Sequence, residues 1–554
     1  MNQTFKFFTA IIIFIFSLSI HAKEKPNSVA VATAHKLATQ AGEDILNSGG
    51  NAFDAAVAVS AALAVVQPYG SGIGGGGFWL LHDAKSDKNI VIDGREVAPL
   101  AATKDMYLDA DGNLTGQSIN GPLAAGIPGV VAALEYIVEN YGALSLSENL
   151  QPAIRYAQEG FNPGDRYLKL VDLRRQALSR SEDAKRIFLQ EEKTLNKNSL
   201  IIQSELAETL MAISMNGATE FYSGETAEKL VEGVRQAGGI WTMEDLQQYQ
   251  IEIREPITTQ YHDLHVIMPP PPTSGGVVIT QILAMLEDVQ FEDFDLVTST
   301  HTIVEAMRRA YQDRAIYLGD PAFTQIPLDK LLNHNYAKEK FSSFNRNSAS
   351  KSKHLTPPPV KGEDTTHFSI LDKEGNYVAA TLSINYPFGS GFVASGTGVL
   401  LNDEMDDFSM GENVANIWGL VGSDANSIEP GKRMLSSMTP LFAHDGTRTL
   451  IVGTPGGSRI ISMLALALLK FQLGADSNDI VSQRRFHHQY IPDEIQFEID
   501  AFSAEEIDKL ASKGHSLKEL NRKYGDMHAI IWDTKTGNIE SASDPRGEGV
   551  AVND

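Results

Sequence analysis

The feature that most constrains this chain is an abrupt change of sequence pattern near residue 365. Residues 342–364 are polar and basic and contain Pro357-Pro358-Pro359, a composition typical of a mobile linker. From Thr365 onwards, successive residues alternate between two faces, and this period of two predicts a β-strand. The linker runs directly into the strand, so we predict a structural boundary between Asp364 and Thr365.

The residues after Thr365 predict a β-hairpin, because alternating runs flank Lys373-Glu374-Gly375 on both sides. A three-residue loop whose glycine is left-handed is a common way to close a hairpin. Counting outward from this loop places Thr365 directly opposite Ser383, with Asn385 just beyond. A hydroxyl group is therefore expected across the hairpin from Thr365.

This arrangement is consistent with two interpretations. A threonine hydroxyl becomes a nucleophile when a base takes its proton, and a free α-amino group, with a pKa of about 7.7–8.0, can act as that base. Thr365 would gain this group if its hydroxyl attacked the carbonyl of Asp364 and water opened the resulting ester. The other interpretation is a plain hairpin, which the local pattern favours because threonine is common in strands.

The composition excludes some classes of partner and chemistry. The 554 residues carry a formal net charge of -24, which argues against nucleic acid and anionic membranes as partners and favours solubility. The chain has no cysteine, so no disulfide and no thiol chemistry is available.

The N-terminus has the pattern of a secretory signal. Lys6 precedes the apolar run Phe7 to Ile20, and cleavage after Ala22 would make residues 1–22 a signal peptide. The apolar run is short for a membrane span, although a retained N-terminal anchor is the alternative. We therefore expect a periplasmic or secreted protein that has no membrane contact after signal cleavage.

The first half is predicted to be mainly helical. A helix over Ala34 to Leu46 is followed by a second over Ala52 to Val66, which is apolar on nearly every side and is expected to be buried. A glycine run then leads to short strands at residues 78–81 and 89–93. Residues 130–320 have a mostly helical pattern.

Short motifs on both sides of Thr365 form a distinctive combination. They are the glycine run 74–77, Asp93-Gly94-Arg95-Glu96, Thr365-Thr366-His367-Phe368-Ser369, Gly398 to Asn402, Met405-Asp406-Asp407-Phe408, Leu435 to Met438, and Pro455 to Ile460. Their order over nearly the whole mature chain resembles the γ-glutamyltranspeptidase family of N-terminal nucleophile hydrolases. This resemblance favours the nucleophile interpretation over the plain hairpin.

The resemblance implies an α+β fold, an αββα sandwich of two stacked antiparallel sheets flanked by helices. It also implies a precursor that cleaves itself between Asp364 and Thr365. The products would be a large subunit, residues 23–364, whose flexible C-terminal tail covers about 342–364, and a small catalytic subunit, residues 365–554. The two are expected to stay associated as a heterodimer.

Gly456 and Gly457 are candidates for an oxyanion hole. They precede a long apolar run, Ser458 to Phe471, and the N–H groups at a helix N-terminus are unpaired and attract anions. Glycine also allows a substrate carbonyl to approach closely. The resemblance implies the same role, and the alternative is an ordinary turn before a helix.

A γ-glutamyl group carries an α-carboxylate and an α-ammonium, so its site needs cationic or hydroxyl donors for one and carboxylates for the other. By resemblance, the α-carboxylate is held by Arg95, Ser436 and Ser437. The α-amino end is held by Glu404, Asp407 and Asn385. Without the resemblance, a surface arginine and a solvated acidic pair would be the simpler interpretations.

The segment Gly411 to Ser423 resembles the lid loop of many family members, with Trp418 as the gate that excludes water. Some relatives have a tyrosine at that position. Ser383 also differs from the threonine often found there, but it keeps a hydroxyl, and its hydrogen bond to the Thr365 amine is expected to survive.

Two other patterns carry less weight. Gly72 to Gly77 formally matches a dinucleotide-binding motif but follows a helix, so a close-packed turn is the better interpretation. The run Arg484 to His488, with His262 and His265 elsewhere, lacks the carboxylate pattern of a metal site. We expect no metal and no organic cofactor.

The predicted activity is acyl transfer from glutathione or a related γ-glutamyl compound to water or an amino-acid or peptide acceptor, through a Thr365 acyl-enzyme. A first alternative is a glutaryl acylase of the cephalosporin type. A glutaryl group has no α-ammonium, so the presence of Glu404 and Asp407 favours the γ-glutamyl substrate. A second alternative is an inactive exported protein that binds γ-glutamyl peptides.

Overall fold

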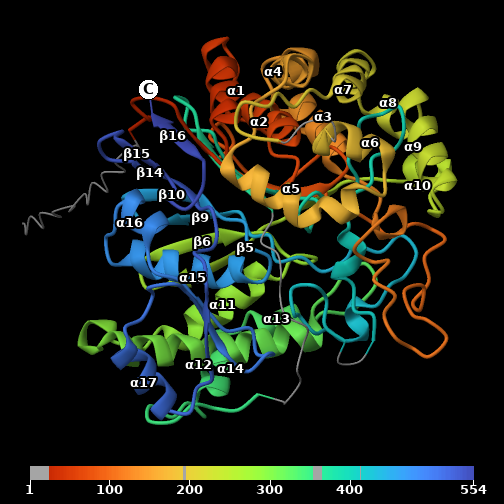
Figure 1. The fold of residues 1–554 in the computed structure, drawn as a ribbon. Coiled ribbons are helices and arrows are strands. Elements are labelled where there is room, and N and C mark those ends of the chain that lie inside the picture. Colours follow the sequence, from red (N-terminus) through yellow and green to blue (C-terminus); the bar gives the residue numbers. More distant parts are fainter. Residues whose placement is uncertain (1–23, 191–194, 353–364, 412–413, 554) are drawn as a thin grey trace, which may run out of the picture.

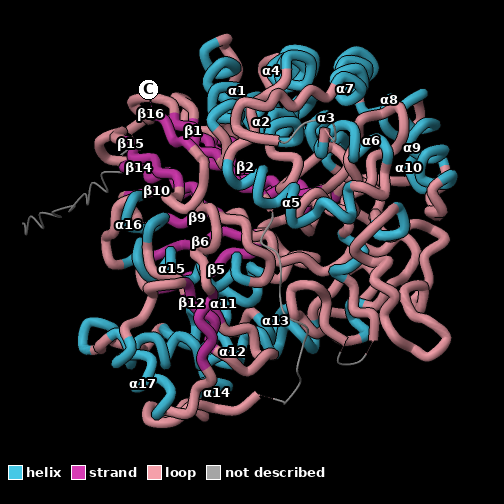
Figure 2. The backbone as a smooth tube through the Cα atoms, viewed as in Figure 1, coloured by secondary structure: helices cyan, strands magenta, loops and turns pink. Residues whose placement is uncertain are grey.

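The strands form two middle layers that are covered by helices above and below (Figures 1 and 2). This computed structural model describes residues 24–190, 195–352, 365–411 and 414–553. The predicted signal peptide, Asp364 and the final residue lie outside the described residues. The layering confirms the predicted αββα sandwich.

The first sheet has seven strands in the order β16-β1-β7-β8-β2-β3-β4, and all neighbours are antiparallel. Strands from both sides of Thr365 therefore alternate within one hydrogen-bonded sheet. The bounds are β16 Val550–Asn553, β1 Ala30–Thr33, β7 Thr366–Leu371, β8 Tyr377–Ser383, β2 Gly76–Asp83, β3 Lys88–Asp93 and β4 Glu252–Arg254.

The second sheet has six antiparallel strands and packs face to face with the first. Ser369 on β7 links the layers, because its Oγ lies 3.2 Å from the carbonyl oxygens of both Ile451 and His528. In spatial order the strands are β15 Ile539–Ser543, β14 His528–Asp533, β10 Arg448–Gly453, β9 Leu441–His444, β6 Leu264–Met268 and β5 Ile257–Tyr261. A separate small sheet contains β11 Phe486–His487, β12 Ile495–Glu498 and β13 Leu517–Leu520.

The helices of the first half cover the outer face of the first sheet (Figure 1). They are α1 Lys36–Asn47, α2 Ala52–Val66, α3 Val130–Tyr141, α4 Leu146–Glu159, α5 Asp165–Leu178, α6 Glu182–Ala184, α7 Ser204–Asn216, α8 Ala218–Tyr222, α9 Glu225–Gln236 and α10 Met243–Gln247. The others lie on the side of the second sheet. They are α11 Gly275–Leu286, α12 Leu296–Tyr317, α13 Leu328–Leu331, α14 His334–Phe341, α15 Arg459–Gln472, α16 Ser477–Ser482 and α17 Ala504–Ser512.

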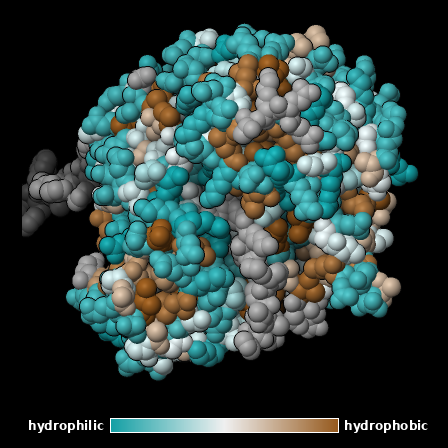
Figure 3. Space-filling model, viewed as in Figure 1, coloured by the Kyte–Doolittle hydropathy of each residue, from teal (hydrophilic) through white to brown (hydrophobic). Residues whose placement is uncertain are grey.

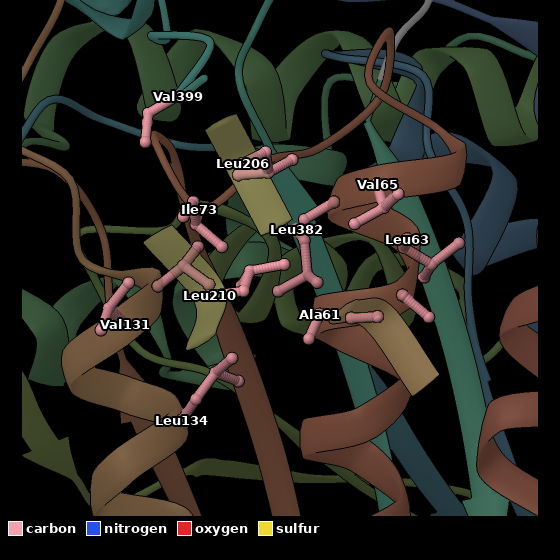
Figure 4. Packing of buried hydrophobic residues seen from close by; sticks show 14 of the residues in the cluster. Ala61, Leu63, Val65, Ile73, Val131, Leu134, Leu206, Leu210, Leu382 and Val399 are labelled. Carbon is pink, nitrogen blue, oxygen red and sulfur yellow. The ribbon is translucent and has the colours of Figure 1, made fainter. Parts of the chain in front are cut away.

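Alternation along the strands builds two large cores. On β2, Trp79 and Leu81 join the core beneath α2, whereas Phe78 and Leu80 join the core between the sheets. Helix α2 is buried along its whole length, as its all-round apolar pattern predicts, because it packs between the sheet and neighbouring helices. Figure 4 shows side chains of α2, α7 and β8 meeting in the first core.

The glycine run before β2 is a site of close backbone approach. A Cβ at Gly74 would overlap the carbonyl oxygen of Leu400, and one at Gly75 would overlap the carbonyl oxygen of Ser383. In the sheet, Gly76 pairs with Ser383. The close-packed turn predicted for this run is confirmed, and it presses β2 against the end of β8.

Part of the predicted flexible tail makes defined contacts with the rest of the protein. Residues 345–352 are held by hydrogen bonds, among them Ser350 N to Glu305 (3.1 Å), Ser352 N to Asp493 (3.0 Å) and Ala349 N to the Lys513 carbonyl (2.7 Å). Their polar composition therefore reflects docking on α12 and on the second half of the chain. Residues 353–364 lie outside the described residues.

The face of the molecule in Figure 3 is mostly hydrophilic, with apolar side chains in small groups. Within the described residues, no helix combines the length and the apolar character that crossing a membrane requires.

The glycine run provides a test of the packing. We expect Gly74→Ala to lower the melting temperature, because relieving a backbone overlap in a packed region typically costs about 1–3 kcal/mol. Gly72→Ala is the matched control, since a Cβ there has its nearest neighbour at 3.6 Å. Thermal unfolding of both variants measures the difference, and equal melting temperatures would contradict the packing described.

Candidate active site

The hairpin after Thr365 forms with the predicted register. Asp372 N donates to the Asn376 carbonyl (3.0 Å), and Gly375 is left-handed with φ of 90°. Thr366 pairs with Leu382 in the sheet, so the next two residues outward along the hairpin are Thr365 and Ser383. Thr365 Oγ1 lies 3.3 Å from Ser383 Oγ. The hydroxyl predicted to lie across from Thr365 is therefore in place.

Thr365 lines a narrow recess to which both halves of the chain contribute. Most residues predicted for the site line this recess: Arg95, Ser383, Asn385, Glu404, Asp407, Trp418, Ser436, Ser437 and Gly457. Gly456 precedes Gly457 in the chain but does not line the recess. Arg314, on the last turn of α12, also lines it and was not predicted.

Arg95 is held by carboxylates from the second half of the chain. Its Nη1 lies 2.5 Å from Glu404 Oε2, and its Nη2 lies 2.7 Å from Asp407 Oδ2. Glu404 and Asp407 belong to a short 3-10 helix, Glu404–Asp407, and the Nε of Arg95 donates to the Met434 carbonyl (3.2 Å). Groups expected to bind opposite ends of a substrate thus contact each other.

The carboxylates around Arg95 have raised pKa values. Burial raises the pKa of Glu404 to about 7; Arg95 opposes this shift and Asp407 adds to it. Burial and the nearby Glu404 also raise the pKa of Glu96, whose Oε2 lies 3.4 Å from Arg95 Nη1. In both carboxyl groups, burial therefore favours the protonated form more than water does.

The Ser436-Ser437 pair presents two hydroxyl groups to the recess. Ser436 Oγ accepts a hydrogen bond from Met438 N (3.1 Å). Ser437 Oγ accepts one from Arg314 Nη2 (3.2 Å), and Arg314 Nε donates to Ser274 Oγ (3.0 Å). The sequence offered little sign of Arg314, because it lies in a long helix beside other arginines that bind elsewhere.

Gly456 and Gly457 have the geometry expected of amide donors. They adopt φ values of 136° and 55°, in the region that favours glycine. Among the described residues, neither N–H has an acceptor. They precede α15, which begins at Arg459 as the apolar run predicted, so an anion here would also meet the helix N-terminus.

Trp418 closes over this corner of the recess. It is 3% exposed, and a Cβ on Gly457 would lie 2.7 Å from its ring. Its Nε1 donates to Asn385 Oδ1 (2.7 Å). Asn385 has a φ of 70°, a left-handed conformation that asparagine tolerates better than most residues.

The other acidic residue of the motif, Asp406, faces away from Arg95. It accepts hydrogen bonds from Ser118 Oγ (2.7 Å) and from Ile417 N (2.9 Å), next to Trp418. Both aspartates therefore hold the segment that carries Trp418, since Asn416 Nδ2 donates to Asp407 Oδ1 (3.0 Å), but of the two only Asp407 also binds Arg95.

Two of the histidines set aside in the sequence, His487 and His488, have side-chain hydrogen bonds within the protein. His487 Nδ1 lies 2.8 Å from Ser462 Oγ and is buried. Within the part of the chain that the structure describes, one group could offer metal ligands, namely His301, Glu305 and His515. The two imidazoles are hydrogen-bonded to each other (2.7 Å), and Glu305 is bound by the guanidinium groups of Arg308 and Arg309. This cluster instead anchors residues 345–350.

The αββα sandwich, with a threonine hydroxyl at the start of a central strand and a recess of polar groups around it, defines the class of N-terminal nucleophile hydrolases. The family model described as Gamma-glutamyltranspeptidase matches residues 38–553. This chain belongs to the gamma-glutamyltranspeptidase family.

Relatives with known names agree with this assignment. A protein of Escherichia coli (strain K12) named glutathione hydrolase proenzyme is 41% identical over 525 residues, covering 93% of this chain and 90% of that one. The crystal structure of a cephalosporin acylase from Bacillus halodurans covers 100% of this chain and 98% of its own, with a TM-score of 0.83 and 26% identity. A Helicobacter pylori gamma-glutamyltranspeptidase structure is 39% identical over 57% of this chain and 92% of its own, with a TM-score of 0.56.

The buried charges allow a stability prediction. We expect Arg95→Met to lower the melting temperature strongly, because removing one partner of a buried ion cluster typically costs about 3–5 kcal/mol. Lys104→Met is the control, since the pair of Lys104 with Asp424 is exposed and its loss should change little. Thermal unfolding that showed equal effects would contradict the assigned role of Arg95 in stability.

Proposed function

We propose that this protein is a γ-glutamyltransferase and glutathione hydrolase whose nucleophile is Thr365. The observation that carries the proposal is the Thr365 hydroxyl, 3.3 Å from Ser383 Oγ, in a recess that also contains Arg95, Glu404 and Asp407. The activity printed in the name of the 41% identical relative supports the same substrate.

We propose that cleavage between Asp364 and Thr365 creates the α-amino group of Thr365, and with it a large piece, residues 23–364, and a small piece, residues 365–554. The two pieces would remain associated, because β7 lies between β1 and β8 and β1 also pairs with β16. Separation would break backbone hydrogen bonds on both sides of β1.

In the first step the new α-amino group takes the proton of the Thr365 hydroxyl as Oγ1 attacks the γ-carbonyl carbon of the substrate. The carbonyl oxygen becomes an oxyanion, for which the free N–H groups of Gly456 and Gly457 are the proposed donors. The tetrahedral intermediate then collapses, the amine leaves with the proton, and a γ-glutamyl ester of Thr365 remains.

In the second step water or an acceptor amine attacks the same carbonyl carbon and gives up a proton to the α-amino base. The Thr365 ester bond breaks, and Oγ1 recovers its proton. Water yields glutamate, and an amine yields a new γ-glutamyl amide. Trp418, packed on Gly457, is the proposed lid over this ester.

The charges of the recess suit the free end of a γ-glutamyl group. Arg95, Ser436 and Ser437 are the proposed donors for its α-carboxylate, and Glu404, Asp407 and Asn385 are the proposed acceptors for its α-ammonium. Binding would require Arg95 to share its present partners with the substrate. A zwitterion can be inserted into such a cluster without adding net charge.

Two alternative functions predict different outcomes. The similarity to a solved cephalosporin acylase keeps a glutaryl substrate open as the second candidate. Glutaryl lacks the ammonium group for which the buried carboxylates Glu404 and Asp407 provide partners, so we favour γ-glutamyl. An inactive binding protein would not need the free amides of Gly456 and Gly457.

We also propose that the protein is exported, with residues 1–22 as a cleaved signal. The sequence pattern of those residues supports this location. Its partners would be small molecules, glutathione and an amino-acid or peptide acceptor.

The nucleophile is tested with Thr365→Ala. The purified unmutated chain should run as two pieces on a denaturing gel and release the anilide from a γ-glutamyl anilide. Thr365→Ala should remain one piece and lose turnover by at least about a thousandfold, because the nucleophile has been removed. Thr366→Ala is the matched control, since the Oγ1 of Thr366 has no partner among the described residues and should not be needed.

Other results would separate the alternatives. An uncleaved Thr365→Ala chain with normal turnover would contradict the mechanism. Faster release from a glutaryl anilide would favour the acylase, and cleaved chains that turn over neither anilide would favour the binding protein.

The pKa of Glu404 predicts a pH dependence of ligand binding. Burial raises this pKa to about 7, so Glu404 is largely neutral below pH 7 and becomes a carboxylate above it. Inhibition by L-glutamate should therefore strengthen from pH 6 to pH 8, because the carboxylate attracts the ammonium group. Glu404→Gln should flatten this profile, and an unchanged slope in that variant would contradict the assignment.

A further inference from the structure

Arg314 is a second buried cation in the recess of Thr365. It lies on the last turn of α12 and is 4% exposed. Its Nε donates to Ser274 Oγ (3.0 Å) and its Nη2 donates to Ser437 Oγ (3.2 Å). Among the described residues, its Nη1 has no hydrogen-bond partner, and no carboxylate forms an ion pair with its guanidinium.

The two arginines of the recess differ in how their charges are matched. Arg95 is bound by Glu404 and Asp407, with Glu96 nearby. Arg314 is bound only by neutral hydroxyl groups. Although burial lowers the pKa of Arg314 to about 10, the side chain remains protonated at neutral pH. The charge of Asp407 also acts on Arg314, but Asp407 is already ion-paired with Arg95. A buried cation without an ion pair of its own is costly, and an anionic ligand would offset that cost.

The hydrogen bonds of Arg314 also orient the serine beside it. A guanidinium can only donate, so Ser437 Oγ must accept, and its own proton is left for another acceptor. Ser274 Oγ accepts from Arg314 and donates to the Ser436 carbonyl (2.7 Å). Arg314 therefore fixes the segment that carries both serines and makes the Ser437 hydroxyl a donor toward the recess.

We propose that Arg314 binds the α-carboxylate of the γ-glutamyl substrate, together with the hydroxyl of Ser437. Arg95 keeps the role proposed for it above, and because it is already paired with Glu404 and Asp407, Arg314 supplies a second cation to the same carboxylate. This inference rests on the proposed function. It assigns the choice of substrates with a free α-carboxylate to a residue of α12.

The experiment compares two anilides, one with a free α-carboxylate and one in which that group is a carboxamide. Neither leaving group carries a carboxylate, so an effect on their ratio reports the γ-glutamyl end rather than the acceptor or the leaving amine. The ratio of kcat/KM for the two substrates is measured in the unmutated enzyme, in Arg314→Met and in Arg314→Lys, each as the cleaved full-length protein.

In Arg314→Met the preference for the free carboxylate should fall about ten-fold or more, mainly through a higher KM; ten-fold corresponds to about 1.4 kcal/mol. Arg314→Lys keeps the charge but cannot bind both serines, so its preference should be intermediate. Arg309→Met is the matched control on α12, because Arg309 is paired with Glu305, and its ratio should equal that of the unmutated enzyme.

A preference that is unchanged in Arg314→Met, with a lower kcat for both anilides, would show a structural role and overturn the inference. If Arg314→Met does not yield cleaved protein, Arg314→Lys decides the matter: a reduced preference supports the inference and an unchanged one overturns it. An unmutated protein that turns over neither anilide would instead contradict the proposed function, and this inference with it.

Discussion

The central sheet is the constraint on which the rest of the structure depends. Strand β7 begins one residue after Thr365 and is hydrogen-bonded on both sides, to β1 from the start of the chain and to β8 across the hairpin. Thr365 is therefore held at the start of a rigid strand. The pairing of β8 with β2 places a strand from the first half of the chain beside the hairpin. A nucleophile on such an element keeps its geometry without help from a loop.

Charge is divided unevenly within the recess that this sheet supports. Arg95 is shared by the buried carboxylates Glu404 and Asp407, whereas Arg314 contacts hydroxyl groups only. A ligand that carries both an ammonium and a carboxylate suits such a division better than a ligand with one charge.

Much of the site could be predicted because its signals are local or are specific motifs. The position of Ser383 across from Thr365 followed from a three-residue loop and a period of two, and the amides of Gly456 and Gly457 followed from the helix behind them. The strands β4, β5 and β6 were missed inside a region predicted to be mostly helical. They are short, and β4 and β6 pair with strands distant in the sequence. The contacts of residues 345–352 could not be predicted either, because their partners, which include Asp493 and Lys513, are also distant in the sequence.

The sequence by itself determined the hairpin, the position of Thr365 just before its first strand, the buried helix α2 and the family. Each of these depends on neighbouring residues or on motifs that can be recognised one at a time. Only the tertiary structure decided that Arg95 is bound by Glu404 and Asp407, that Asp406 accepts a hydrogen bond from Ile417 N beside Trp418, and that Arg314 enters the recess from α12. These contacts join segments far apart in the chain, so they depend on how the layers pack and not on any local preference of the backbone.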